Sequence, residues 1–340
     1  MESNTNKEQI TASELASLWV VYQKKTMMVR VTGFLLSKNQ DSEYRKILQT
    51  FHKGEKNFVD ELVTIFKHEG AVVPVGFTEK DVNHEVPRLF DDTFAVMYLR
   101  TMMKIATGIH AIHMTMAYRK DIMDLYRRFT EFAEEILVKA TQCLLGKGVL
   151  PKPPYVTLPQ HVAFTEEKAY RSGFKIGGHR RSLNTIEVAY LYQGVESNVI
   201  GMKLMTGFAQ VAREEEISKY FFQGKELAKT IISKFSGSLL DSDINVPAPS
   251  AGLVTDSTMS PFSDKLMLYN TSLLSDFALG SNALGTSFSL RKDLSMKMLM
   301  TGKDITKFAN EGGNLTMKYG WMEEPPQMED RIQLTKRKSK

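Results

Sequence analysis

Residues 87–94 read PRLFDDTF and residues 260–267 read SPFSDKLM, and these two stretches reveal how the chain is organised. Phe90 in the first stretch and Phe262 in the second stand 172 positions apart. At the same offset and without a gap, Gly108 meets Gly280, Arg119-Lys120-Asp121 meets Arg291-Lys292-Asp293, and Pro153-Pro154 meets Pro325-Pro326. A repeat of this length indicates two copies of one folded unit.

Upstream of these stretches the two copies match less regularly. Gly33 and Gly207 stand 174 positions apart, whereas Phe51 and Phe221 stand 170 positions apart. The smaller offset predicts that the turn between the first two helices differs in length by four residues between the copies.

The repeat also sets the expected domain boundaries. We expect a first unit over residues 1–154, a linker over 155–182, a second unit over 183–326 and a basic tail over 327–340. The 340 residues suit two domains of ordinary size. The linker contains a proline and several glycines, which are typical of a connecting segment.

Each copy has the apolar period of helices rather than of strands. In the first copy, two helical hairpins are joined by a non-periodic stretch of about twenty residues from Gly70 to Asp91, which spans a bundle at roughly 3.3 Å per residue. Short turn, long crossover and short turn is the connectivity of ferritin-like bundles. The predicted fold is therefore all-α: a tandem pair of ferritin-like four-helix bundles, each with a long crossover between its second and third helices.

Two local features of this fold are predicted as well. Asp121 is expected to cap the fourth helix of the first copy. Gly108 and Gly280 lie inside the third helices, where a glycine costs about 1 kcal/mol. They indicate either a close helix crossing or a cavity for a ligand.

The composition is that of a soluble globular protein, with 42% hydrophobic and 24% charged residues. No segment reads as a signal peptide or a membrane span. The single cysteine, Cys143, indicates a reducing compartment, so we expect a cytoplasmic location. The net charge is +5, but no groove-binding motif accompanies the basic tail, so a nucleic-acid partner is not expected. The sequence names no partner and leaves a homo-oligomer open.

A ferritin-like bundle raises the question of a di-iron site. Such sites use Glu-x-x-His on two helices, and none of the seven histidines has a glutamate three positions before it. His110 and His113 remain a candidate pair because positions i and i+3 share a helix face, and Glu134 of the fourth helix is a candidate third ligand. The second copy has Asn282 and Gly285 in their place, so the alternative is that both histidines are partly buried polar residues.

Glu14 and Glu187 occupy matching positions near the start of the first helix of each copy. A carboxylate at that position suits the helix dipole, and the alternative is a role in metal binding. Together with His110, His113 and Glu134, they complete the candidate ligands for an iron or manganese ion. No catalytic residue and no other cofactor is predicted.

Four stretches carry a resemblance to a known family. Residues 73–78 (VPVGFT), 87–94, 260–267 and 320–323 (GWME) resemble an uncharacterised family of duplicated, ferritin-like helical proteins of bacilli, known only as a domain of unknown function. The resemblance covers nearly the whole chain and implies a tandem four-helix fold and a spore-forming Gram-positive source. It supplies no activity and no catalytic residues. A looser similarity to spore-coat ferritin-like proteins implies a spore or stress setting.

Three functions follow as hypotheses. The first is a non-catalytic helical protein with a structural or interaction-forming role. The second is a divergent metal-dependent oxidoreductase of ferritin-like type that uses His110 and His113. The third is a carrier of a small apolar ligand within a bundle, favoured by the small residues of the third helices and by the 19 methionines. The interior of each bundle discriminates between them, because it is either packed, or polar and convergent, or hollow and apolar.

Overall fold

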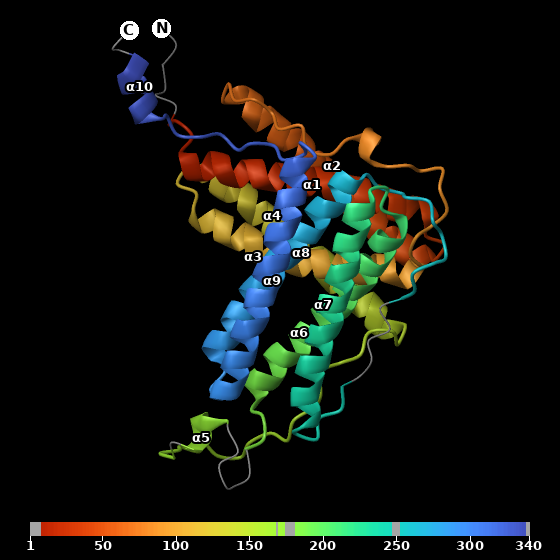
Figure 1. Ribbon diagram of the computed structural model, residues 1–340, viewed down its shortest axis with the longest axis vertical. Coiled ribbons are helices and arrows are strands. Elements are labelled where there is room, and N and C mark those ends of the chain that lie inside the picture. The colour runs from red at the N-terminus through yellow and green to blue at the C-terminus, as the bar shows by residue number, and fades with distance from the viewer. Residues whose placement is uncertain (1–7, 168, 174–180, 247–251, 338–340) are drawn as a thin grey trace.

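The computed structural model describes residues 8–167, 169–173, 181–246 and 252–337 (Figure 1). The long helices of the first half are α1 (Ala12–Lys38), α2 (Ser42–His68), α3 (Asp92–Thr115) and α4 (Lys120–Gly146). Those of the second half are α6 (Thr185–Val211), α7 (Glu215–Leu240), α8 (Asp264–Phe288) and α9 (Lys292–Lys318). Shorter helices are η1 (Glu79–Asp81), α5 (Ala169–Ser172) and α10 (Arg331–Arg337). The all-α prediction is confirmed, since the regular elements in these ranges are helices.

None of the helices in the described ranges is both long enough and apolar enough to cross a membrane. Residues 155–167 of the predicted linker run exposed along the outside of the second half, and α5 follows them. Residues 327–336 of the basic tail are exposed, and this part of the chain includes the short helix α10. The linker and the tail are therefore exposed, whereas the long helices of both halves bury the apolar residues of the core.

Asp121 does not cap α4, so that prediction is wrong. The N-cap position is Arg119, which makes no side-chain cap hydrogen bond. Asp121 instead accepts two hydrogen bonds from the Arg119 guanidinium, at 2.6 and 3.1 Å. Arg291 and Asp293 make the same pair at the start of α9, at 2.8 and 3.1 Å. The repeated Arg-Lys-Asp stretch thus forms an Arg–Asp ion pair at the start of α4 and again at the start of α9.

The turn between the first two helices has the same length in both halves. Three residues separate α1 from α2 and three separate α6 from α7, so the predicted four-residue difference is wrong. Asp92 and Asp264 hold the two turns alike, each carboxylate accepting two backbone N–H groups of the turn. The offset is therefore 173 residues along α1 and α2, and Phe51 corresponds to Gly224 rather than Phe221. Positions three apart share a helix face. An alignment of α2 with α7 that is displaced by three residues therefore still pairs apolar residues, which explains the wrong offset of 170.

The crossovers of the two halves pair with each other in an antiparallel manner. Val82 bridges to Phe262, and Phe90 bridges to Val254. Exchanging the two halves converts one bridge into the other, since both residue pairs are related by the offset of 172. The flanking backbone hydrogen bonds obey the same exchange, from Asn83 N to Pro261 O at 2.8 Å and from Thr255 N to Leu89 O at 2.9 Å. The halves are thus related by an approximate two-fold axis that passes between the crossovers.

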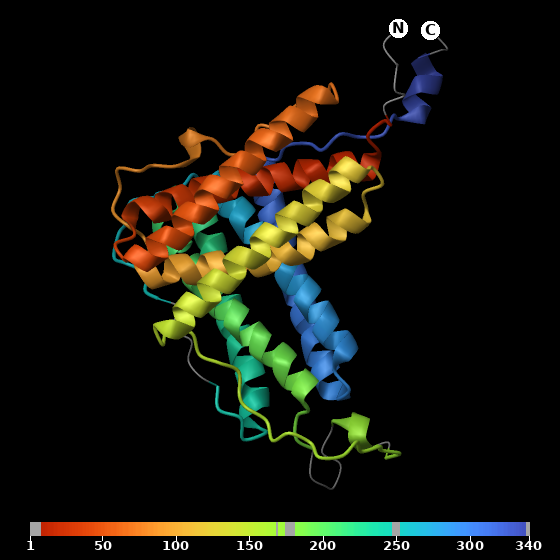
Figure 2. The ribbon, with the colours of Figure 1, turned by 180° about the vertical axis from the view of Figure 1, so that it is seen from behind.

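One apolar core contains residues of both halves, and a second apolar cluster lies within the first half. The Phe34 ring of α1 lies 5.3 Å from the Phe262 ring of the second crossover. At the centre, the buried Asn270 amide donates to the buried Tyr98 hydroxyl at 2.7 Å. The apolar cluster that includes these contacts contains residues of both halves. Figures 1 and 2 show the helices of one half running across the direction of the other half.

Gly108 and Gly280 are both exposed, and the predicted close helix crossing at these positions is wrong. A Cβ atom added at either glycine would meet no atom within 4 Å outside its own helix neighbourhood. The two glycines therefore neither permit a close approach of helices nor line a cavity.

Candidate functional site

Glu14 is buried at the start of α1 and serves the fold. Its carboxylate accepts a hydrogen bond from the Thr11 backbone N–H at 2.9 Å, which closes a capping box. It also accepts from the backbone N–H groups of Tyr118 and Arg119, at 2.9 and 2.7 Å. Burial acts to raise the pKa of Glu14, but the hydrogen bonds from Arg119, Thr11 and Tyr118 outweigh burial and lower the pKa to about 2. Glu14 thus ties the start of α1 to the turn before α4.

Glu187 has the same role in the second half. It accepts from the backbone N–H groups of Asn184 and Arg291, both at 3.0 Å. The Arg181 guanidinium adds two hydrogen bonds at 2.7 and 2.8 Å. The matching positions of Glu14 and Glu187 are therefore explained by helix capping and by the connection between helix starts.

His110 and His113 lie on one face of α3, as predicted, but Glu134 does not join them. His110 is buried, with its ring 5.4 Å from the Phe129 ring, whereas Glu134 is exposed on α4. Within the described ranges, no group of three or more His, Cys, Asp or Glu side chains is placed to hold a metal ion. The structure does not bring the five predicted ligands together.

Two buried lysines face this part of the interior, and the sequence reasoning missed both. The Lys25 ammonium lies 3.1 Å from a Glu55 carboxylate oxygen and 4.0 Å from the centre of the Phe129 ring. The neighbouring Lys24 is equally buried, and its amine has no hydrogen-bond partner among the described residues. The pKa of Lys24 is lowered to about 7, chiefly by burial. The nearby Lys25 charge also lowers this pKa, whereas the Glu55 charge raises it by less.

Burial and, to a lesser extent, these lysines set the protonation of the two histidines. Burial lowers the pKa of His113 to about 4, and the charge of Lys24 acts in the same direction. Burial also lowers the pKa of His110 far below its usual range, with added effects of Lys25 and Lys24. Both imidazoles are therefore neutral at pH 7. A further cation placed beside them would be repelled by Lys25, which is an unfavourable setting for a metal ion.

The corresponding positions of the second half are small and uncharged. At the offset of 173, Lys24, Lys25 and Glu55 correspond to Ser197, Asn198 and Ala228. Gly201 and Gly224 likewise correspond to Met28 and Phe51. The second half thus loses the buried ion pair and two large side chains at the same place in the repeat.

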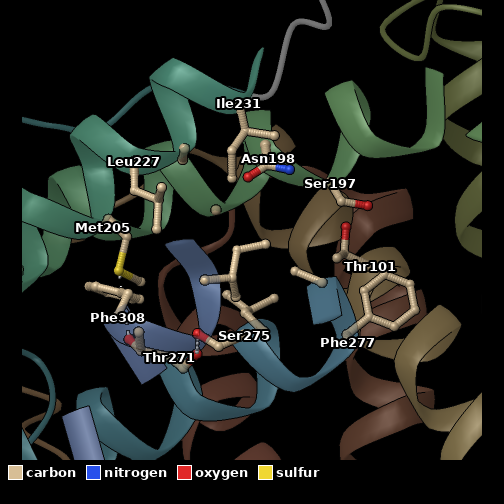
Figure 3. Close-up of a pocket in the computed structure, with 16 residues that line it drawn as sticks. Thr101, Ser197, Asn198, Met205, Leu227, Ile231, Thr271, Ser275, Phe277 and Phe308 are labelled. Carbon is tan, nitrogen blue, oxygen red and sulfur yellow. Dashed lines mark hydrogen bonds between the residues drawn. The ribbon is translucent and has the colours of Figure 1, made fainter. Parts of the chain in front are cut away.

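A cavity of about 70 Å³ occupies this place in the second half (Figure 3). Residues of α6, α7, α8 and α9 line it, among them Asn198, Ala228 and Ser275, and Thr101 of α3 completes the wall. The Asn198 amide donates to the Gly194 carbonyl at 2.8 Å, and the Ser275 hydroxyl donates to the Thr271 carbonyl at 3.0 Å. Because these polar groups are bonded to their own helices, the cavity offers mainly apolar surface. A sulfur atom of Met205 adds an adaptable wall.

The fold and the interior define the class of the molecule as a duplicated all-helical protein with two unlike interiors. A family described as "Protein of unknown function (DUF3231)" matches residues 1–162 and again residues 171–334, and the chain belongs to this family. The predicted membership in an uncharacterised family of duplicated units is confirmed.

Comparison with individual proteins adds little. No curated protein matches the chain. A solved structure of a "putative spore coat protein" from Bacillus halodurans C-125 is similar, with 14% identity and a TM-score of 0.41. The similarity covers 44% of this chain and 98% of that protein.

Proposed function

We propose that the protein is a non-catalytic binding protein of ferritin-like build, which holds a small apolar molecule, or the apolar end of a longer one, in the second half. The observation that carries this proposal is the cavity beside Asn198 and Ala228, at the position that the first half fills with Lys25 and Glu55. The first half shows that large side chains can fill this position. The second half has the smaller residues Asn198 and Ala228 there, which leave the space open.

The size of the cavity limits the ligand. An engineered apolar cavity of roughly 150 Å³ holds benzene, so about 70 Å³ suits a molecule or chain end of a few carbon atoms. Each buried methylene group contributes about 0.8 kcal/mol.

A series of straight-chain alcohols from ethanol to pentanol tests the proposal. We expect the affinity, measured by calorimetry, to rise with chain length and then to stop rising when the cavity is full. Gly201→Met introduces the residue that the first half has at this position, and no atom lies within 4 Å of a Cβ atom added there. This variant should lose binding and gain stability.

Gly280→Ala is the matched control, because it replaces an exposed helical glycine away from the cavity. It should gain stability and keep the affinity for alcohols. Equal affinity of the wild type and Gly201→Met, or no binding to the wild type, contradicts the proposal.

A structural or interaction-forming role is the second candidate. It is favoured by the residues that the two halves share, since Glu14, Glu187, Arg119 and Arg291 all hold helix starts together. If the wild-type protein binds none of the alcohols, the structural or interaction-forming role becomes the better explanation. Spore or stress association and a cytoplasmic location stay predictions under either role.

The metal-dependent oxidoreductase also stays a prediction. It places iron or manganese at His110 and His113, beside the Lys25 charge that acts on His110. Measuring the metal content of the protein purified with iron and manganese tests it, and stoichiometric metal lost in His110→Ala would favour it.

A further inference from the structure

A second cavity, of about 210 Å³, lies between the two halves. The lining residues come from α1, the first crossover, α7, α8, α9 and the segment that follows α9. Three of the stretches that carry the family resemblance meet here. Phe77 belongs to residues 73–78, Lys265 to residues 260–267, and Trp321 to residues 320–323.

An ion pair between Lys265 and Glu323 joins these stretches, and both side chains also hydrogen-bond to the backbone of the first crossover. The Glu323 carboxylate accepts from the backbone N–H groups of Val75 and Gly76, at 2.9 and 2.8 Å. The Lys265 ammonium donates to the Gly76 carbonyl at 3.1 Å and lies 3.4 Å from Glu323. The same ammonium lies 5.0 Å from the centre of the Phe77 ring. The pair therefore builds one wall of the cavity and leaves its charge balanced.

The position related by the two-fold axis is filled by side chains. Arg100 donates to Glu196 at 2.7 Å and to the Thr141 hydroxyl at 2.9 Å. Lys104 also pairs with Glu196. Glu196 corresponds to Gln23, Arg100 to Ser272 and Thr141 to Gly313. Gln23, Ser272 and Gly313 all line the cavity. The three corresponding residues of the cavity are uncharged, and Ser272 and Gly313 are smaller than their counterparts, whereas Lys104 corresponds to Asp276, which does not line the cavity.

We infer that this cavity binds a neutral planar aromatic molecule of about the size of indole. Phe77, Tyr220 and Trp321 provide aromatic walls, and aromatic rings in stacked or edge-on contact contribute about 0.5–1.5 kcal/mol beyond the area that they bury. Gly313 lets a ring approach the α9 backbone, because a Cβ atom added there would meet no atom within 4 Å outside its own helix neighbourhood, whereas Tyr220 already packs against Gly312. An added Cβ atom at Gly312 would collide with the Tyr220 hydroxyl.

Size and charge narrow the ligand further. A cavity of roughly 150 Å³ holds benzene, so about 210 Å³ admits a fused pair of rings. The ligand is neutral because Lys265 and Glu323 already pair with each other. Gln23 and Ser272 supply an amide and a hydroxyl at the wall, which suit a ring nitrogen or a hydroxyl substituent.

Calorimetry with indole as the probe tests this inference on the full-length protein. The triple variant Gln23→Glu, Ser272→Arg and Gly313→Thr introduces into the cavity the residue types of Glu196, Arg100 and Thr141, which form the corresponding network between the halves. We expect indole to bind the wild type and to bind the triple variant at least tenfold more weakly, with the helical circular dichroism signal unchanged. If the triple variant does not fold, Gly313→Thr alone adds a side chain to open space at the cavity wall and should also weaken binding.

Gly201→Met separates this inference from the proposed function. It fills the other cavity and should leave the affinity for indole unchanged. Indole that binds the wild type and the folded triple variant equally well, or that does not bind the wild type, overturns the inference. Loss of indole binding in Gly201→Met overturns it too, because the probe would then occupy the cavity inside the second half.

Discussion

The two halves place different chemistry at one position of the same scaffold. In the first half, the space between the helices holds the Lys25–Glu55 ion pair and the Lys24 amine, which has no hydrogen-bond partner in the described ranges. In the second half, the same space is a cavity beside Asn198 and Ala228. The helix bounds and the Arg–Asp ion pairs at the starts of α4 and α9 are nevertheless alike. Duplication therefore preserved the framework, while the two interiors diverged.

The largest expected effect comes from breaking the ion pair of the first half. Glu55→Ala leaves the buried Lys25 ammonium without its carboxylate and should lower the free energy of unfolding by roughly 3–5 kcal/mol. The double variant Lys25→Asn with Glu55→Ala copies the second half and should lose clearly less. Urea unfolding measures both, and equal losses in the single and double variants would contradict the account.

Lys24 gives the next effect, with the opposite sign. Replacing a buried, unpaired amine by a methyl-terminated chain of similar length should raise the free energy of unfolding of Lys24→Met by roughly 1–4 kcal/mol. The pKa of Lys24 is about 7 in the folded protein and near 10.5 when exposed. The cost of burying it is therefore complete below pH 7 and fades as the pH rises from 7 to 10.5.

The gain of Lys24→Met should accordingly be larger at pH 6 than at pH 9.5. Ser197→Met is the control, because Ser197 is the corresponding residue of the second half and does not titrate. A gain of Lys24→Met that is independent of pH would show that the amine is not buried as described.

Glu14 gives a smaller effect that appears in acid. Glu14→Gln weakens hydrogen bonds from the backbone N–H groups of Thr11, Tyr118 and Arg119 and should cost about 1–3 kcal/mol at pH 7. The pKa of Glu14 is about 2 in the folded protein, below its ordinary value of 4.5. The stability that Glu14 contributes is thus present above pH 4.5 and is lost as the pH falls toward 2.

Thermal unfolding between pH 6 and pH 3 tests this. The difference in melting temperature between the wild type and Glu14→Gln should shrink as the pH falls. Glu187→Gln should follow the same course, since the hydrogen bonds from Arg181 and from the backbone lower the pKa of Glu187 against the effect of its burial. A constant difference would mean that neither carboxylate acts through its charge.

The smallest effect is expected at the exposed glycines of the third helices. Gly108→Ala and Gly280→Ala should each raise the free energy of unfolding by about 0.5–1 kcal/mol, because alanine favours the helix and no neighbouring atom opposes its methyl group. A loss of stability in either variant would indicate a close helix contact at that glycine.

Much of the framework could be predicted from the sequence. The repeat and the helical period predicted the all-α fold and the placement of most long helices, and the resemblance carried by residues such as 73–78 and 320–323 predicted the family. The offset along α2 was wrong because Phe221 matches Phe51 by residue type, whereas burial pairs Phe51 with Gly224. An amphipathic helix tolerates a shift of three in such a match, so residue type alone could not settle the register.

The interiors could not be predicted in the same way. Lys24 and Lys25 are residue types that are almost always exposed, but α1 is buried on nearly all sides, so no helical period marked them as interior. The cavity depends on how several small side chains on three helices meet, which the sequence does not show. The histidine pair was correctly placed on one helix face, but its surroundings came from α1 and α4.

A crystal structure of the protein under xenon gas tests most directly that one position of the repeat is filled in the first half and hollow in the second. The account predicts xenon in the second half, between α6, α7 and α8 beside Asn198, Ala228 and Ser275. It predicts no xenon beside Lys25 and Glu55 of the first half. Xenon missing from the second half, or present to the same extent at both positions, would contradict the account.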